Sequence, residues 1–326
     1  MKPNRRKMKL SQYAVTILLI LTLNFFLPRL MPGDPFTVLS ADEGEVHTTY
    51  SEEDIQRYRA YYGLDRPLVH QYASYMIGIL QGDLGYSIQF KQDVGTVIFN
   101  RLPWTLFLVG ISVGLSALIG VFFGVISGYK KNTGIDQFLY SFFITLSEIP
   151  GFMIGLLLLF FFGAYLNLFP LSGGMTHFRD YASRGEQILD ILHHSLLPIT
   201  ALTITGMGGF YLIARNTMVS IIDKPYMMMA KAKGLSRTRI LFYHGLKNAF
   251  LPIVTRIFLS FGQAMGGALL VENVFNYPGI GRLMREAVTL RDYPLIQGVF
   301  IFMTLFVLSM NYLSDVIYKR LDPRVI

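Results

Sequence analysis

Long apolar runs separated by polar stretches dominate the chain. A run of about twenty residues is what a helix needs to cross a hydrocarbon core roughly 30 Å thick. Because unsatisfied backbone groups are costly in lipid, the connections between runs must lie outside it. The pattern predicts an all-α integral membrane protein. Its six transmembrane helices are expected at residues 12–31, 104–129, 137–169, 196–213, 250–271 and 293–314.

Two of these runs need interpretation. The first follows a basic tail, as a signal peptide would, but it is long and lacks an A-x-A-like site before the turn at residues 32–35. We therefore interpret it as a retained anchor. The third is overlong and interrupted at Glu148-Ile149-Pro150. An ionisable group at depth usually faces a cavity or a partner. For Glu148, a role facing the interior of the helix bundle and a salt link at an interface or between subunits both stay open.

Composition supports the membrane assignment. Of the 326 residues, 52% are hydrophobic and only 15% are charged, whereas a soluble domain carries about 25% charged residues. These values exclude a soluble enzyme, a disordered chain and a secreted disulfide scaffold. The absence of cysteine excludes disulfides, thiolate metal sites and a cysteine nucleophile.

The basic residues indicate the orientation. Residues 1–9 carry five basic residues and no acid, and residues 215–247 carry seven against the single Asp223. Residues 32–101 carry ten acidic and five basic residues instead. By the positive-inside rule, both termini and the 215–247 loop are cytoplasmic, and the long first loop faces outward. Arg256, six residues into the fifth run, is expected to snorkel inward.

The outer loop is too long for a bare connector. Ser51 followed by acids resembles a helix N-cap, and residues 69–80 have helical spacing that ends at Gly82. We expect a small ordered extracytoplasmic subdomain between the first and second helices. Whether it binds a partner or only supports the bundle stays open.

Glycines indicate close helix packing. Gly120, Gly124 and Gly128 recur every four residues, and Gly262 and Gly266 repeat the spacing. Small residues at this spacing let membrane helices approach closely.

Catalytic motifs are missing from the sequence. It contains no G-x-x-x-x-G-K-[ST] phosphate loop and no H-E-x-x-H, and its one G-x-S-x-G match, at residues 110–114, lies inside the apolar run 104–129 and not at the strand-to-helix turn of a nucleophile elbow. His193 and His194 lie near Asp190, but adjacent residues point to different helix faces, so a shared metal ion is awkward. We interpret the two histidines as an interfacial pair at a helix end.

The 215–247 loop has the most distinctive pattern. Pro225 suits a first helical turn, Gly234 suits a helix stop, and Ser236 suits the cap of a second helix. This predicts a short cytoplasmic helix with an exposed Met-rich face, which either docks into a protein or lies on anionic lipid. The segment consists of Tyr226, Met227, Met228, Met229, Ala230, Lys231, Ala232, Lys233 and Gly234.

Part of this loop resembles a known motif. Ala230-Lys231-Ala232-Lys233-Gly234, with Leu251-Pro252 downstream, resembles the EAA loop of ATP-binding-cassette (ABC) importer permeases. Met228 and Met229 stand where the general motif has Glu and Ala, as in the dipeptide/oligopeptide/nickel branch. Further segments resemble the B-type subunit of that branch: Pro32-Gly33-Asp34-Pro35, Gly63-Leu64-Asp65-Arg66-Pro67, Gly82-Asp83-Leu84-Gly85-Tyr86-Ser87, Arg101-Leu102-Pro103, Leu171-Ser172-Gly173, Val274-Phe275-Asn276-Tyr277-Pro278-Gly279-Ile280-Gly281, Arg291-Asp292-Tyr293-Pro294 and Asp322-Pro323-Arg324.

The resemblance implies a type I ABC importer permease fold and a non-catalytic transport subunit. Residues 226–234 would form the coupling helix that fits an ATPase subunit. The implied partners are a second homologous permease subunit forming a heterodimer, two ABC ATPases and an extracytoplasmic substrate-binding protein. The chain itself would hold no cofactor, since ATP and Mg belong to the ATPases. The implied location is a prokaryotic inner membrane.

The implied cargo is a di- or oligopeptide, with nickel or a metal chelate as the alternative. A membrane-embedded enzyme and a scaffold remain alternatives of another class. The domains expected are residues 1–31 (tail and first helix), 32–101 (outer loop), 94–315 (permease domain, with the coupling loop at 221–247) and 316–326 (cytoplasmic tail).

Overall fold

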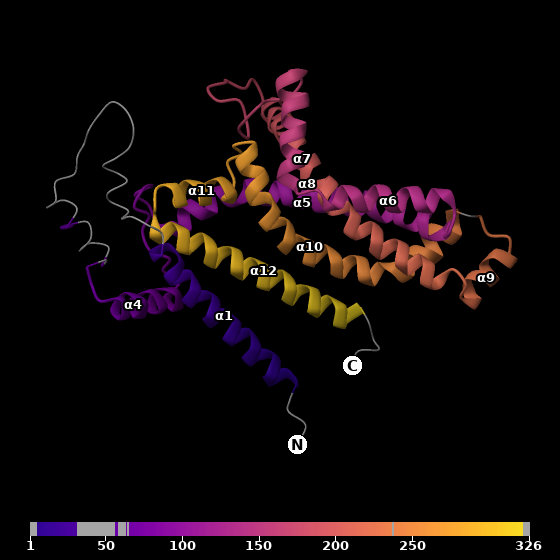
Figure 1. Ribbon diagram of the computed structural model, residues 1–326, viewed down its shortest axis with the longest axis horizontal. Coiled ribbons are helices and arrows are strands. Elements are labelled where there is room, and N and C mark those ends of the chain that lie inside the picture. The colour runs from indigo at the N-terminus through magenta and orange to yellow at the C-terminus, as the bar shows by residue number, and fades with distance from the viewer. Residues whose placement is uncertain (1–4, 31–55, 58–62, 64, 237, 322–326) are drawn as a thin grey trace. The chain divides into compact units, whose positions relative to one another are not determined.

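The computed structural model describes residues 5–30, 56–57, 63, 65–236 and 238–321. The predicted cap at Ser51, the turn at residues 32–35 and the segment Asp322-Pro323-Arg324 lie outside these residues. Figure 1 labels the helices, which are α1 (Arg5–Arg29), α4 (Leu68–Gln81), α5 (Val94–Tyr129), α6 (Gly134–Glu148), α7 (Gly151–Leu158), the π-helix η1 (Leu159–Tyr165), α8 (Arg184–Ile221), α9 (Pro225–Ala232), the π-helix η2 (Arg239–Gly245), α10 (Leu246–Val274), α11 (Ile280–Thr289) and α12 (Tyr293–Leu321).

The helices confirm an all-α membrane protein. Within the described residues, α5, α8, α10 and α12 are each long and apolar enough to cross a membrane. A fifth span is formed if α6 and the α7–η1 segment, which are bent by 93°, count together. The apolar part of α1, Val15–Arg29, is shorter than a full span. Among the described residues, four of the six predicted spans therefore meet the length and hydropathy expected of a crossing helix, and five do if the bent pair counts as one span.

The break in the third span lies where the sequence indicates it. Ile149, the residue before Pro150, has extended backbone angles (φ −78°, ψ 124°) and ends α6. A residue before proline is disfavoured in the helical region, because the proline ring clashes with its backbone. α7 then starts directly after the proline.

The fourth span extends well beyond the predicted residues 196–213. α8 already begins at Arg184, where the Ser183 side chain accepts a hydrogen bond from the Glu186 backbone N–H. Its polar first turns are held by hydrogen bonds such as that from Tyr181 to Asp190. Hydropathy does not detect a helix segment whose polar groups are satisfied in this way, so the predicted start of this helix was wrong.

The described chain divides into two compact units. Unit 1 comprises residues up to 101 together with residues 283–305, and unit 2 comprises residues 102–282 and 306 onward. In unit 1, α4 confirms the helix predicted at residues 69–80, and it ends at Gly82, whose φ of 80° favours glycine. The Asn24 side chain of α1 donates hydrogen bonds to Tyr75 of α4 and to the Gln297 carbonyl of α12.

Unit 2 is organised around α8, which α6, α7 and α10 contact directly (Figure 1). The repeat Gly120, Gly124 and Gly128 lies against α8, and a Cβ at any of the three would collide with the α8 backbone. The predicted close packing at these glycines is confirmed. The Gly262 repeat is looser: a Cβ at Gly262 would meet only Val307 at 3.5 Å, and no described atom lies within 4 Å of one at Gly266.

Candidate functional site

The distinctive loop folds into α9 with the predicted boundaries. Pro225 is its first residue, and the Met227 backbone N–H donates to the Lys224 carbonyl at 2.9 Å. The chain leaves the helix at Gly234, whose φ is +70°, and the Leu235 N–H returns to the Ala230 carbonyl at 3.3 Å. Ser236 then accepts a hydrogen bond from the Arg239 N–H, as a cap of the following helical segment.

The two faces of α9 differ sharply. Met227 is fully buried and Ala230 is buried, whereas Tyr226, Met228 and Met229 are 42%, 55% and 59% exposed. The predicted exposed Met-rich face is correct for Met228 and Met229 and wrong for Met227. Met227 and Ala230 are three residues apart, so they share one side of the helix, which packs on the protein.

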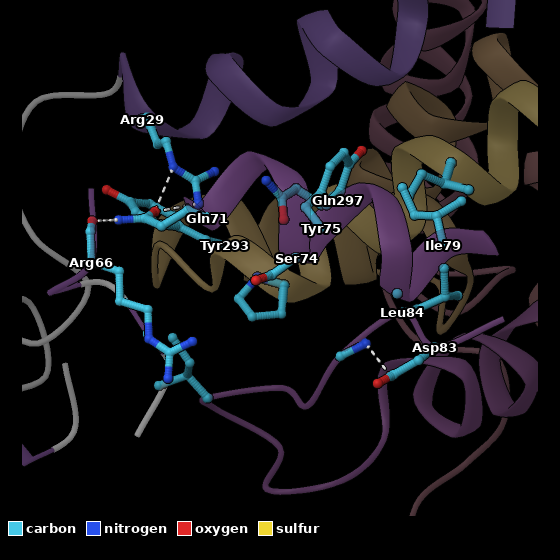
Figure 2. A pocket seen from close by; sticks show the side chains of 16 residues that line it. Arg29, Arg66, Gln71, Ser74, Tyr75, Ile79, Asp83, Leu84, Tyr293 and Gln297 are labelled. Atoms are coloured by element: carbon cyan, nitrogen blue, oxygen red, sulfur yellow. Dashed lines mark hydrogen bonds between the residues drawn. The ribbon is translucent and has the colours of Figure 1, made fainter. Parts of the chain in front are cut away.

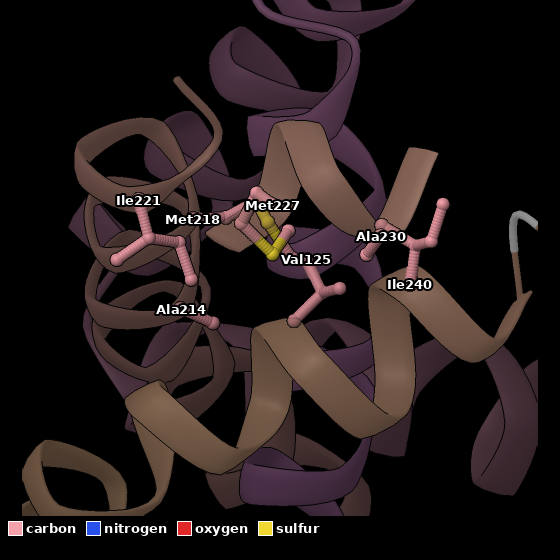
Figure 3. Packing of buried hydrophobic residues seen from close by; sticks show 7 residues of the cluster. All are labelled: Val125, Ala214, Met218, Ile221, Met227, Ala230 and Ile240. Carbon is pink, nitrogen blue, oxygen red and sulfur yellow. The ribbon is translucent and has the colours of Figure 1, made fainter. Parts of the chain in front are cut away.

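The buried face of α9 rests in an apolar cluster that we call the α9 seat. Figure 3 shows that Met227 lies beside Met218 of α8. A Cβ at Gly245, in η2, would meet the methyl group of Met218, so η2 also approaches closely. α9 is thereby packed against the adjoining ends of two long helices. The seat consists of Val125 of α5, Ala214, Met218 and Ile221 of α8, Met227 and Ala230 of α9, and Ile240 of η2.

Close to the α9 seat, a buried ion pair joins three helices. The Asp136 carboxylate of α6 accepts hydrogen bonds from Arg215 of α8 through Nε at 2.7 Å and Nη2 at 2.8 Å. It also accepts from the Ser127 hydroxyl of α5 at 2.5 Å and from the Asn132 N–H at 3.0 Å. Paired, bidentate geometry of this kind is the strong form of a charged hydrogen bond. We call these groups the Asp136 joint.

No sequence motif predicts the Asp136 joint. Asp136 and Arg215 are 79 residues apart in the chain, and no motif connects them. A usable signal was present in the charges alone: Asp136 is an acid beside the basic pair Lys130-Lys131 at the start of a predicted span. Such a residue requires a partner if the helix start is buried.

Glu148 is the last residue of α6, at the bend before α7. It is exposed, and no hydrogen bond or ion pair joins its side chain to a described residue. The structure brings it neither to the α9 seat nor to the Asp136 joint. Its assignment to the pathway or to an interface stays a prediction.

The two adjacent histidines have separate partners. His193 lies 3.0 Å from the Leu168 carbonyl through Nε2, and His194 lies 2.9 Å from the Asp190 carbonyl through Nδ1. Within the part of the chain that the structure describes, no group of three or more His, Cys, Asp or Glu side chains could hold a metal ion.

A buried carboxylate that sequence reasoning missed organises the turn after α10. Glu272 is fully buried and accepts hydrogen bonds from the Thr105 hydroxyl at 2.6 Å and from the Gly281 N–H at 2.5 Å. A Cβ at Gly279 or Gly281 would collide with this carboxylate. Nearby, burial raises the pKa of Tyr277 to about 12. The position of the Glu272 carboxylate explains why the segment 274–281 needs glycine at Gly279 and Gly281. We therefore interpret Glu272 as a structural residue.

Unit 1 contains a cavity of about 390 Å³ (Figure 2). The guanidinium of Arg29 lines it and donates to Gln71 Oε1 through Nε and Nη2 and to the Phe25 carbonyl through Nη1. Gln71 in turn donates to the Arg66 carbonyl at 2.8 Å. Burial raises the pKa of Tyr75, another lining residue, to about 12. The polar groups around this cavity therefore hold the helices of unit 1 together.

The chain has close relatives among known proteins. Residues 120–326 match the family described as binding-protein-dependent transport system inner membrane component, and residues 5–109 match the N-terminal family of such components. The chain is 34% identical over 315 residues to the oligopeptide transport system permease protein AppB of Bacillus subtilis, covering 96% of each chain. It is 31% identical over 310 residues to the glutathione transport system permease protein GsiC of Escherichia coli, covering 95% of this chain and 94% of that one. The similarity thus extends over nearly the whole of each protein.

Proposed function

The chain belongs to the family of binding-protein-dependent transport system inner membrane components, and from this we propose that it is the permease subunit of an ABC importer in which α9 docks into an ATPase subunit. The observation that carries the docking role is the division of α9 into a buried and an exposed face. Flexible, polarisable Met side chains such as Met228 and Met229 suit a groove of another protein. The coupling segment is Tyr226, Met227, Met228, Met229, Ala230, Lys231, Ala232, Lys233 and Gly234.

The contacts below α9 suit the transmission of movement. A push on the exposed face reaches Met227 and the α9 seat, and through it the ends of α5 and α8. The Asp136 joint links the same helix ends to α6. Packed interiors transmit strain because they are dense and resist compression. ATP-driven movement of the ATPases would thereby tilt three spans together, which is what alternating access requires.

We assign di- or oligopeptides as the cargo. One relative is named for oligopeptides and the other for glutathione, itself a peptide. Both names favour peptides over nickel or a metal chelate. Membership in a family of transport components argues against the membrane-embedded enzyme and the scaffold.

The proposed assembly contains this chain, a second homologous permease subunit, two ATPases that bind ATP and Mg, and a substrate-binding protein outside. The bias of Lys and Arg supports cytoplasmic termini in a prokaryotic inner membrane, with α9 on the cytoplasmic side. The domain boundaries at residues 1–31, 32–101, 94–315 and 316–326 remain predictions of the same scheme.

Gly234→Pro tests the docking role. Proline holds φ near −65° and cannot adopt the φ of +70° at which the chain leaves α9. We expect the variant to reach the membrane at normal levels, to lose co-purification of the ATPases and to lose peptide uptake. Quantitative mass spectrometry of the complex, purified in mild detergent through a tag on this chain, measures the first effect.

Gly82→Pro is the matched control, since Gly82 ends α4 with a similar φ of +80° in unit 1. It should retain the ATPases. Normal uptake and normal ATPase recovery in Gly234→Pro would overturn the assignment of α9 as the coupling helix.

A further inference from the structure

Arg256 is a cation of unit 2 that forms no ion pair with any described residue. It lies on α10, ten residues after the start of that helix. Its guanidinium rests on Gly209 of α8: a Cβ at Gly209 would be 2.7 Å from Nη2 and 3.3 Å from Nε. The missing side chain of Gly209 therefore provides the space that the guanidinium occupies.

The described residues leave the Arg256 guanidinium without a hydrogen-bond partner at Nε. Its Nε is buried without a hydrogen-bond partner, and no ion pair joins Arg256 to an acid among the described residues. Arginine carries five N–H donors and stays charged, so an unpaired guanidinium cannot escape its cost by losing a proton. By contrast, Arg29 donates three hydrogen bonds and Arg215 donates two, each within its own unit.

The depth of Arg256 separates it from the helix ends. Gly209 precedes Ile221, the last residue of α8, by twelve residues, or about 18 Å at 1.5 Å per residue. It precedes Arg215 by six residues, or about 9 Å. The guanidinium thus contacts α8 further from the end of that helix at Ile221 than the Asp136 joint does. It does not lie at a helix end, where snorkelling would bring it. An ionisable group at such depth normally faces a polar partner or a water-filled path.

The α8 segment around Gly209 is closely packed against other helices at Gly206 and Gly208. The α8 segment that it contacts is rich in glycine, and two serines approach the same segment from other helices: a Cβ at Gly206 would meet Ser116 of α5, and one at Gly208 would meet Ser147 of α6. Ser116 and Ser147 therefore cover α8 at Gly206 and Gly208, whereas Arg256 covers it at Gly209, and no ion pair joins Arg256 to a carboxylate of the described residues.

We propose that Arg256 binds the carboxylate of the transported peptide on its way through the permease. This rests on the proposed function, because it names the part of the peptide that the permease itself recognises. Carboxylate and guanidinium form bidentate, charge-assisted hydrogen bonds, which are the strongest that an arginine makes. The unpaired guanidinium is preorganised for a ligand that arrives with its own negative charge.

The test compares a peptide with a free C-terminal carboxylate and the same peptide as a C-terminal amide. Both are taken up by proteoliposomes that contain the complete complex, with the binding protein at saturation. Arg256→Gln should lower uptake of the free acid by about tenfold or more and leave uptake of the amide nearly unchanged. The binding protein is the same in both preparations, so its own preference cancels when the acid-to-amide ratio of the variant is divided by that of the wild type.

A second readout omits the binding protein. Millimolar free-acid peptide should raise the thermal midpoint of the wild-type complex, and it should not raise that of Arg256→Gln. Arg256→Lys, which keeps the charge but loses the bidentate fork, should lie between the two in both assays.

The outcomes separate the two proposals. An equal fall for acid and amide would overturn the inference, because it would indicate that Arg256 pairs with another subunit and supports the assembly. Unchanged uptake of both peptides in Arg256→Gln would also overturn it. If the wild-type complex takes up neither peptide, the proposed peptide cargo itself is wrong.

Discussion

Two arginines of unit 2 are held in opposite ways: Arg215 belongs to α8, and Arg256 of α10 contacts α8 at Gly209, six residues or about 9 Å along the helix from Arg215. Arg215 is held by both oxygens of Asp136, which two further donors also bind. Arg256 rests on bare backbone at Gly209, with a buried Nε that has no partner. The first arrangement fixes the relative positions of three helices. The second leaves a positive charge that a ligand can neutralise. A transport subunit needs both, a part that keeps its shape while it moves and a part that stays open to its cargo.

The largest expected effect on stability comes from Asp136→Asn, which leaves Arg215 without an ion-pair partner, as Arg256 is. Removing one partner of a buried ion pair costs about 3–5 kcal/mol, because the remaining charge is left uncompensated. We expect a strongly lowered thermal midpoint or no folded complex, measured by size-exclusion chromatography after heating. Asp180→Asn, at an exposed acid of the segment before α8, is the control. Equal midpoints for the two variants would contradict the role of the Asp136 joint.

The next effect concerns the α9 seat. Met227→Ala removes a fully buried side chain, and such a change typically costs about 2–5 kcal/mol. Met228→Ala, one residue away on the exposed face, should change stability by less than about 0.5 kcal/mol. Chemical denaturation of the purified complex measures both. If the two variants were equally stable, α9 would not be anchored through Met227.

A related variant examines the exposed face itself. Met228→Glu introduces the acid that the general EAA motif has at this position. Because Met228 is 55% exposed, we expect normal insertion and surviving peptide uptake. Complete loss of uptake with an intact complex would mean that the ATPase groove in this branch requires an apolar side chain there.

A smaller effect is expected where α5 approaches α8. A Cβ at Gly124 would lie 2.5 Å from the Tyr211 carbonyl oxygen, so Gly124→Ala forces the helices apart. Overpacking of this kind costs about 1–3 kcal/mol. Gly114→Ala is the matched control on the same helix, since no described atom lies within 4 Å of its Cβ. A thermal midpoint for Gly124→Ala that is not below that of Gly114→Ala would contradict the close approach.

The smallest effect on stability is expected for Arg256→Gln. The substitution removes a charge that no described group balances, so the thermal midpoint should stay equal or rise slightly. A fall as large as that of Asp136→Asn would show that Arg256 already has a partner in the assembled complex. Together with Asp136→Asn, this variant measures directly how differently the protein treats the two charges.

Local signals in the sequence were sufficient for short elements. α4 and α9 follow from helical spacing with a glycine at the end, and in both the glycine has the positive φ that this reasoning requires. The broken third span follows from Pro150 for the same reason, since proline restricts the backbone locally. Such features depend on a few neighbouring residues and can be predicted without knowing the fold.

Features that depend on distant partners were not predicted. The burial of Met227 rather than Met228 is decided by which side of α9 faces the α9 seat, and the sequence of the loop contains both residues in the same context. The Asp136–Arg215 pair and the buried Glu272 depend on residues 79 and 167 positions away. Hydropathy likewise missed the polar start of α8, because hydrogen bonds rather than apolar side chains stabilise it.

The bend at Pro150 has a consequence for how the protein is made. α6 has 15 residues and measures about 22 Å at 1.5 Å per residue, which is too short to cross a hydrocarbon core of roughly 30 Å alone. The non-helical backbone at Ile149 and Pro150 is tolerated at depth only where other protein covers it. α8 contacts both α6 and α7, and it is synthesised after them. We therefore expect the third span to leave the translocon unfinished and to reach its bent form only once α8 has been inserted beside it.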